Sequence, residues 1–450
     1  MIIRFECDGF KSLRDVVLPL RPFQAFVGPN NAGKSNFFDA LRLLSLVPDH
    51  DLPEVLQSVR GEPSRLFTQL PDGKDARTMR LAVELLVEPT YLDELEGKVT
   101  LSHTRLRYEI EITRDDRADA PTGNAISITS EQLVAIGADV PLPWPSSGAF
   151  RQAYARTGRP RSFISPNPNG GTLVHADRGT AVRTFPNRKG RRQSILSAIR
   201  DAGEFPHIAA VRHELRHWRF AQFVPAMLRE LDAIGGPDTL DTSGRHLAAS
   251  LHRIAQDDPL NALEISNHLR QLVPAARRVT VRQLPDYARY LLELEMEDGH
   301  RFSSDTLSDG TLRVLAILAL LYNPEQAGVI LIEEPENGIH PRRVDMVTAL
   351  LKEAASDPIS DDVEPSDPLR QMFITTHSPS LVDALAVDDL ILVEQPTLIR
   401  GHGLPSVRTT RYRPAASFVA PTDQVDESDD APIRADLGEL WTSGILGGVP

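Results

Sequence analysis

Cysteine is nearly absent from the 450-residue chain, which contains only Cys7. A disulfide within the chain is therefore impossible, which fits the reducing cytoplasm. No apolar run approaches the roughly 18 residues of a membrane span, and the longest extends only from Val314 to Tyr322. The first residues, Met1 to Glu6, are typical of a short strand and not of a signal peptide. We expect a cytoplasmic protein that makes no contact with membranes.

The sequence also lacks an excess of positive charge. Lysine and arginine number 49 against 62 aspartates and glutamates, which gives a net charge of -13. The chain as a whole is therefore not a basic nucleic-acid-binding protein, and DNA could be contacted only through a local patch. The best candidate patch is the stretch from Arg183 to Arg192, which could equally be a solvated loop.

Sustained heptads and internal repeats are missing too, which excludes a long coiled coil. Both ends of the chain instead alternate between strand and helix patterns, as in an α/β fold with a parallel sheet. Residues 116–205 show no clear pattern, and residues 208–272 have helical spacing. The expected strands are 2–7, 16–20, 23–27, 79–88, 105–113, 278–282, 290–296, 329–332, 372–375 and 390–394, and the expected helices include 34–46, 312–322, 342–355 and 379–385.

A phosphate-binding motif lies between an expected strand and an expected helix. The stretch from Gly28 to Ser35 matches G-x-x-x-x-G-K-[ST], in which backbone N–H groups and the helix N-terminus face the phosphates. Lys34 would reach the β- and γ-phosphates of ATP, and the Ser35 hydroxyl would bind Mg²⁺. The residues that we expect to bind the nucleotide here are Gly28, Pro29, Asn30, Asn31, Ala32, Gly33, Lys34, Ser35 and Asn36.

Two carboxylates follow a continuous apolar strand at residues 329–332. A buried parallel strand has such a sequence, and ligands bind at its carboxyl end. Glu333 would hold Mg²⁺ through a water molecule, and Glu334 would orient and deprotonate the attacking water. His377 directly follows a later strand, where its imidazole could contact the γ-phosphate.

Lys34 and Glu333 are about 300 residues apart, yet both must reach one magnesium ion. Residues 1–115 and 275–414 therefore form the two lobes of one head, with residues 116–274 as a mainly helical insertion. Residues 415–450 form an acidic tail. This order of motifs resembles the ABC-type ATPases of the RecF, SMC and OLD (overcoming lysogenization defect) group, and the resemblance covers a little over half of the chain. Gly9 to Leu13 also looks like this group.

The resemblance implies roles for several further residues. Leu307 to Thr311 would be the ABC signature, Glu336 to Gly338 would lie in the D-loop, and His377 would be the switch histidine. Members of the group form head-to-head dimers, in which the signature of one subunit covers ATP bound to the other. Two features depart from the family pattern: the metal-binding acid is glutamate where aspartate is commoner, and the Q-loop glutamine is not obvious, with Gln69 as a weak candidate. The signature residues that would contact ATP are Ser308 and Gly310, although Ser308 could simply cap the helix that follows.

Within the group, the lack of coiled coils argues against SMC proteins. The residues after Glu394 are too few for the TOPRIM domain of OLD nucleases. The chain looks most like bacterial "AAA family" predicted ATPases, which are RecF/OLD-like heads without a nuclease. The resemblance implies an ATP-driven homodimeric switch in phage defence or DNA repair, acting on DNA or on a separately encoded effector. The main alternative is the nucleotide-binding subunit of an ABC transporter.

A second motif suggests a different enzyme. His213 to His217 matches H-E-x-x-H, in which two histidines bind zinc and the glutamate between them is a base. Arg212 and Arg216 would repel a dication, and no third ligand follows at the metzincin spacing. We expect an amphipathic helix here, with Trp218 and nearby phenylalanines packed inward. A zinc peptidase is the less favoured alternative.

The end of the chain is unusually apolar for an acidic tail. Residues 415–436 are acidic and contain proline, which is typical of a mobile segment. The stretch 437–450, however, contains Trp441 and several leucines and isoleucines. Either this segment folds back onto the head, or it docks a separately encoded, nuclease-like effector.

Overall fold

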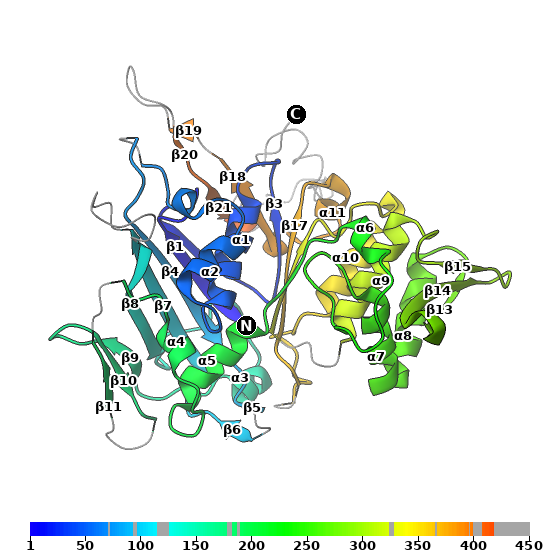
Figure 1. Ribbon diagram of the computed structural model, residues 1–450. Coiled ribbons are helices and arrows are strands. Elements are labelled where there is room, and N and C mark those ends of the chain that lie inside the picture. Colours follow the sequence, from blue (N-terminus) through cyan, green and yellow to red (C-terminus); the bar gives the residue numbers. More distant parts are fainter. Residues whose placement is uncertain are drawn as a thin grey trace, which may run out of the picture.

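Two large sheets organise the computed structural model (Figure 1). It describes residues 1–70, 73–92, 97–114, 126–177, 182–186, 190–323, 328–364, 367–395, 397–398 and 407–417. No helix in these ranges is long and apolar enough to cross a bilayer.

The first sheet has eight antiparallel strands in the order β11-β10-β9-β8-β7-β4-β1-β2. Its strands are β1 (Ile2–Asp8), β2 (Val16–Pro19), β4 (Thr78–Leu86), β7 (Arg105–Arg114), β8 (Ile126–Ala135), β9 (Ser162–Pro166), β10 (Thr172–His175) and β11 (Val182–Phe185).

The second sheet has six strands in the order β12-β16-β17-β3-β18-β21, and all are parallel except β21. This is the parallel sheet that the strand and helix alternation predicts. Its strands are β3 (Phe23–Val27), β12 (Arg219–Ala221), β16 (Gly328–Glu333), β17 (Arg370–Thr376), β18 (Leu390–Glu394) and β21 (Arg411–Pro414).

The P-loop helix α1 (Lys34–Leu46) lies between the two sheets (Figure 1). Phe37 of α1 contacts Phe5 of β1 and Phe26 of β3, with ring centroids 5.0 and 4.5 Å apart. Val329 and Leu331 of β16 belong to the same apolar core. The helix that carries the phosphate-binding residues is thereby held on both sides.

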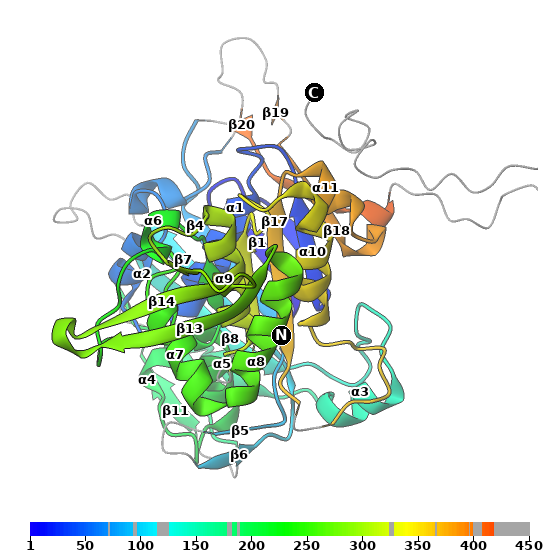
Figure 2. The ribbon, with the colours of Figure 1, turned by 90° about the vertical axis from the view of Figure 1, so that its right-hand side faces the viewer.

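The opposite face of the parallel sheet is covered by a helical lobe. Ile330 and Ile332 of β16 point to that side and pack in a second core. A small sheet lies against the outer side of α7 and α8 (Figure 2). The helices of the lobe are α6 (Pro225–Leu228), α7 (Leu247–Asp257), α8 (Pro259–Leu272), α9 (Asp309–Leu321), α10 (Val344–Glu353) and α11 (Pro379–Asp383), and its strands are β13 (Ala276–Leu284), β14 (Arg289–Met296) and β15 (Arg301–Ser303).

The region predicted as a mainly helical insertion consists of two different parts. Its first part, within residues 126–185, forms β8 to β11 and lengthens the antiparallel sheet. Its second part contains most of the helices but is interrupted by β12, so residues 208–272 are not continuously helical. Leu228 is the last residue of α6, and Leu231 lies beyond it and is exposed. At β12, the free energy gained by parallel pairing with the buried strand β16 outweighs the local preference for a helix.

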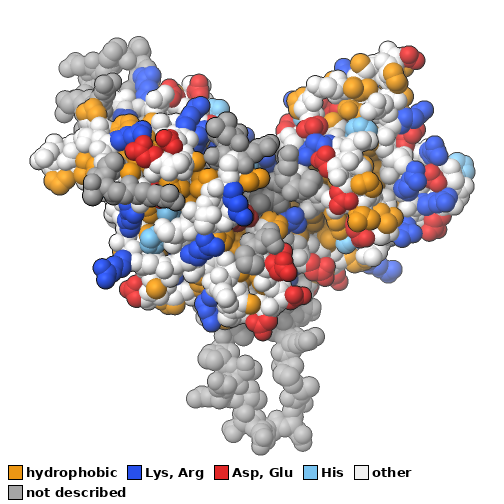
Figure 3. Space-filling view, turned by 90° about the horizontal axis from the view of Figure 1, so that it is seen from below, with side chains coloured by type: hydrophobic (Ala, Val, Ile, Leu, Met, Phe, Trp, Pro, Cys, Tyr) orange, Lys and Arg blue, Asp and Glu red, His pale blue; other side chains and the backbone are white. Residues whose placement is uncertain are grey.

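Short elements complete the antiparallel side of the molecule. They are α2 (Leu52–Ser58), α3 (Gly148–Tyr154), α4 (Ile195–Ala198), α5 (Pro206–Arg216), β5 (Thr90–Leu92) and β6 (Lys98–Thr100). Seen from below, a notch separates this side from the helical lobe, and acidic and basic side chains are interspersed on the described part of that surface (Figure 3).

Candidate nucleotide site

The phosphate-binding motif forms the turn between β3 and α1. Gly33 has a φ of 105°, and a Cβ there would lie 2.0 Å from Thr410 Oγ1, so a larger residue would not fit. The neighbouring Asn31 is also left-handed, and Tyr412 donates a hydrogen bond to Gly33 O at 2.9 Å. Asn36 Nδ2 donates to the Ser12 hydroxyl at 2.7 Å. The loop is thus held in shape by residues from both ends of the chain.

Lys34 is almost completely buried, with 7% of its surface exposed. Its ammonium donates to Gly28 O, and to Pro29 O at 3.0 Å, so the side chain is folded over the loop. Burial lowers the pKa of Lys34, while the charges of Glu334 and its neighbours act against this shift. The cation therefore lies where the loop would hold a phosphate chain.

Ser35 and Glu333 come together as predicted. The Ser35 hydroxyl donates to Glu333 Oε2 at 3.0 Å, although the two residues are 298 positions apart. Hydroxyl and carboxylate oxygens are suitable ligands for Mg²⁺, which usually keeps several waters and phosphate oxygens in its shell. Two such oxygens at this separation fit one magnesium ion.

An arginine that the sequence patterns did not reveal also contacts Glu333. Arg60, two residues after α2, donates to Glu333 Oε1 at 2.8 Å and to Asp39 Oδ1 at 3.0 Å. Asp39 also accepts from Lys11 at 2.6 Å, which ties the Gly9 to Leu13 motif to α1. Burial disfavours the Arg60 charge, but Glu333 and Asp39 raise the pKa of Arg60 overall. No short motif contains Arg60, because its partners come from distant segments.

Glu334 and His377 are also brought together. His377 Nδ1 lies 3.1 Å from Glu334 Oε1, and Asn337 donates to Oε2 of the same carboxylate at 2.5 Å. Glu334 has a left-handed backbone with a φ of 49°, and Arg313 of α9 donates to its carbonyl oxygen at 3.0 Å. The carboxylate is thereby oriented at the carboxyl end of β16, where it could accept a proton.

A glutamine that the sequence analysis missed lies beside these acids. Gln222 follows β12 directly, and the pairing of Ala221 with Ile332 places it opposite Glu333. It also lines a cavity of about 160 Å³ with Arg60 and Glu333. Gln69, the weak Q-loop candidate, is exposed, and its backbone pairs with Asp75. The position of Gln222 next to Glu333 makes it a better Q-loop candidate than Gln69, and only the strand order reveals this position.

Ser308 and Gly310 lie at the start of α9. Ser308 caps α9, and its hydroxyl accepts from Thr311 N–H at 3.2 Å. Both residues line a groove of about 630 Å³, to which no residue of the P-loop contributes. The P-loop residues and the two signature candidates therefore do not line one groove.

The sequence matches one family profile across most of its length. The profile is AAA_21, described as "AAA domain, putative AbiEii toxin, Type IV TA system", and it matches residues 23–383. The chain belongs to the AAA_21 family. No curated protein matches the chain.

The solved structures that the chain resembles include SMC heads. An SMC head bound to the C-terminal winged-helix domain of ScpA is 14% identical, with a TM-score of 0.50, and the match covers 93% of this chain and 99% of that one. The SMC head domain from Thermotoga maritima is 12% identical, with a TM-score of 0.40 and coverage of 92% and 98%. At such identities the likeness shows the fold alone. The AAA_21 chain thus has the fold of an ABC-type P-loop ATPase head, as predicted.

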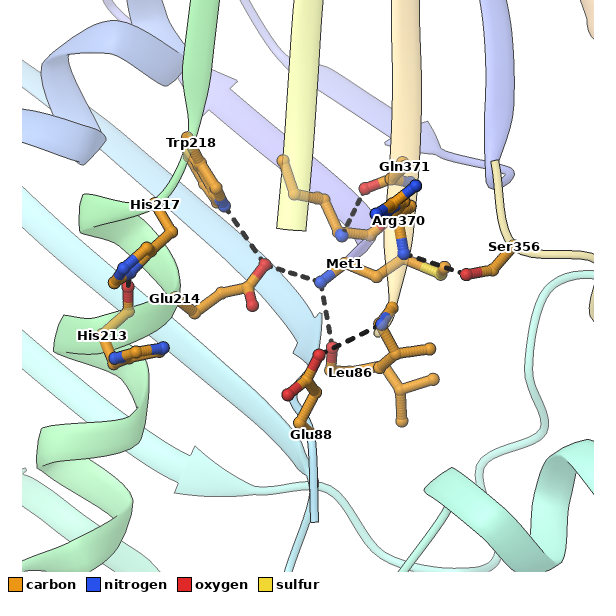
Figure 4. A network of polar contacts seen from close by, with 12 residues as sticks. Met1, Leu86, Glu88, His213, Glu214, His217, Trp218, Ser356, Arg370 and Gln371 are labelled. Carbon is orange, nitrogen blue, oxygen red and sulfur yellow. Dashed lines mark hydrogen bonds and ion pairs between the residues drawn. The ribbon is translucent and has the colours of Figure 1, made fainter. Parts of the chain in front are cut away.

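The H-E-x-x-H stretch of this AAA_21 protein has a structural role (Figure 4). Glu214 accepts from the Met1 amine at 2.6 Å and from the Trp218 indole at 3.2 Å. Helix α5 ends at Arg216, and His217 Nδ1 bonds to His213 O at 2.6 Å. Burial and the neighbouring His217 lower the pKa of His213 to about 4. With Glu214 engaged in this way, the geometry does not favour a zinc peptidase.

The segment that contains Trp218 and Phe223 does not form part of the predicted amphipathic helix. Trp218 and Phe223 are buried, as expected, but both lie beyond α5, one before β12 and one after it. The apolar side chains are therefore held by the strand and loop rather than by a helix face.

Two arginines of the basic stretch from Arg183 to Arg192 are engaged within the protein. Arg183 pairs with Glu204, and Arg191 pairs with the buried Glu131 at 3.3 Å. Residues 187–189 lie outside the described residues, as do residues 437–450 of the expected docking segment. The charges available to DNA on this stretch are therefore fewer than its sequence suggests.

Proposed function

We propose that the protein is an ATP-hydrolysing switch of the RecF/OLD-like type, in which two copies of the head hold ATP between them. The observation that carries this proposal is the separation of the two half-sites within one chain. Ser35 contacts Glu333, and Lys34 lies within charge interaction of Glu334, whereas Ser308 and Gly310 line a groove that includes none of these four residues. In a head-to-head dimer, the groove of each copy would cover the P-loop of the other.

The contacts at the P-loop support hydrolysis as well as binding. Lys34 and the loop amides would hold the β- and γ-phosphates, and Ser35 and Glu333 would hold Mg²⁺, which neutralises phosphate charge when bound. Glu334 would take a proton from the attacking water, because His377 and Asn337 already orient its carboxylate. His377 would then face the γ-phosphate.

We infer that the switch acts on a separately encoded effector protein. The family description names a toxin–antitoxin system, which supports a role in phage defence; DNA repair is the other role that the resemblance implies. Two arginines of the candidate DNA patch are already paired with acids. A protein partner that docks on the apolar segment 437–450 is therefore favoured over DNA bound at Arg183 to Arg192.

Substitution of Ser308 by arginine tests the dimer. Ser308→Arg would place a long side chain in the groove, so ATP should still bind each monomer while dimers and turnover are lost. Light scattering with and without ATP measures assembly, and phosphate release measures turnover. Arg278→Ala, which removes an exposed charge on β13, is the matched control and should behave like the wild type. A Ser308→Arg protein with full activity would exclude capping by a second copy.

Deletion of residues 437–450 tests the effector. The shortened protein should hydrolyse ATP within about twofold of the wild-type rate, because no residue assigned to the ATP site lies in this segment. It should lose co-purification with the protein encoded beside its gene, and with it any protection against phage. Deletion of the acidic residues 421–431 is the control and should leave binding intact. Loss of folding or of hydrolysis would show that the segment belongs to the head.

A further inference from the structure

The groove that carries the signature is a single preformed surface. Its walls are the start of α9 and the stretch from Gly338, the last residue assigned to the D-loop, to Arg343. A Cβ on Gly310 would lie 2.1 Å from Gly338 O, so the two walls are in direct backbone contact. Residues from the end of α8, Gln271 to Pro274, close the third side. The signature and the D-loop would therefore approach a partner together.

The charge of this groove is entirely positive among the residues that the structure describes. The charged residues that line it are arginines, joined by His340, and no aspartate or glutamate is among these lining residues. His340 Nδ1 accepts from Arg342 N–H at 3.3 Å. A neutral His340 therefore carries its proton on Nε2, which can act as a hydrogen-bond donor. The lining is suited to a multiply charged anion.

Arg342 differs from the other arginines around the signature. Arg343 donates to Leu272 O, Arg229 donates to Leu307 O at 2.8 Å, and Arg313 donates to Glu334 O at 3.0 Å. These three guanidinium groups hold the lobe together. The side chain of Arg342 is exposed and has no hydrogen bond or ion pair with the described residues. The Arg342 guanidinium therefore stabilises no contact within the described part of the chain.

We propose that Arg342 binds the polyphosphate of ATP held in the P-loop of a second copy of this chain, beside Ser308. The inference rests on the proposed dimer and adds to it a cation supplied in trans. A guanidinium can donate two parallel hydrogen bonds to phosphate oxygens, and its charge is not lost at neutral pH. It would therefore both tighten the ATP-bound dimer and neutralise charge that develops on the γ-phosphate during hydrolysis.

The test separates binding by the monomer from assembly of the dimer. Dimer affinity is measured with ATP in a Glu334→Gln background by sedimentation over a range of protein concentrations. Arg342→Ala should raise the dimer dissociation constant at least tenfold, and Arg342→Lys should recover part of that loss. Arg278→Ala, the same change on strand β13, no residue of which lines the groove, should leave it unchanged. ATP affinity is measured separately in monomeric Ser308→Arg protein, where Arg342→Ala should change it by less than twofold.

Three other results of these measurements would each contradict the proposal at a different step. A loss of ATP affinity in the monomer would show that Arg342 acts on nucleotide in its own chain, which overturns the proposal. An unchanged dimer affinity would overturn it as well, because Arg342 would then make no contact across the interface. If Glu334→Gln itself stayed monomeric with ATP, the proposed dimer would fail first, and the inference would fail with it.

Discussion

Glu334→Gln is expected to bind ATP as well as the wild type and to hydrolyse it at least about a hundredfold more slowly. Glutamine has nearly the same shape as glutamate, but its amide cannot accept a proton from water at neutral pH. The contacts from Asn337 and His377 show that this carboxylate is held in one orientation, as a base requires. Phosphate release measures turnover, and a fluorescent ATP analogue measures affinity.

The control for this variant is Glu353→Gln, the same chemical change at an exposed position of α10. It should leave both quantities unchanged. Because hydrolysis would no longer separate the heads, Glu334→Gln should also accumulate ATP-bound dimers. Turnover at the wild-type rate in Glu334→Gln would show that another group activates the water.

Lys34→Ala is expected to abolish detectable ATP binding, and with it hydrolysis and ATP-dependent dimers. The Lys34 ammonium lies folded over the P-loop, and without it the β- and γ-phosphates would face backbone amides alone. Equilibrium binding of labelled ATP is the measurement. Lys98→Ala removes an exposed lysine from β6 and provides the control.

Lys34→Ala and Glu334→Gln are expected to have opposite effects on the ATP-dependent dimer, so the two variants are best compared directly. Loss of the cation at Lys34 should keep the heads apart, whereas loss of the base at Glu334 should hold them together. Normal ATP affinity in Lys34→Ala would mean that the nucleotide is held somewhere other than the P-loop. Dimers in that variant would mean that assembly does not need ATP.

Much of the site could be predicted because its chemistry lies in short consecutive stretches. The P-loop motif lies between a strand pattern and a helix pattern, and the two glutamates directly follow an apolar strand pattern. Each motif can therefore be recognised within one short stretch of sequence. The requirement that Lys34 and Glu333 reach one magnesium ion predicted that distant segments meet, and the hydroxyl of Ser35, next to Lys34, lies 3.0 Å from a Glu333 oxygen. Strong periodicity likewise predicted α1, β3 and β16 within a residue or two.

Other features could not be predicted because they depend on partners from distant parts of the chain. Arg60 has no motif, and its importance appears only where it bridges Asp39 and Glu333. Gln222 becomes a site residue through the position of β12 beside β16. The H-E-x-x-H stretch is a related case: the sequence already disfavoured a zinc peptidase there, but only the structure shows that Glu214 contacts the Met1 amine.

The sequence by itself therefore determined the ABC-type P-loop head fold, and it predicts which residues would hold phosphate, metal and water, since these roles follow from residue type and local order. Only the tertiary structure decided which glutamine and which arginines stand beside those residues, and that residues 126–185 extend a sheet. It also decided that Arg342 has no partner within the described chain while its neighbours do. The physical reason is that strand pairing and side-chain packing join segments far apart in sequence, and their free energy outweighs local propensity.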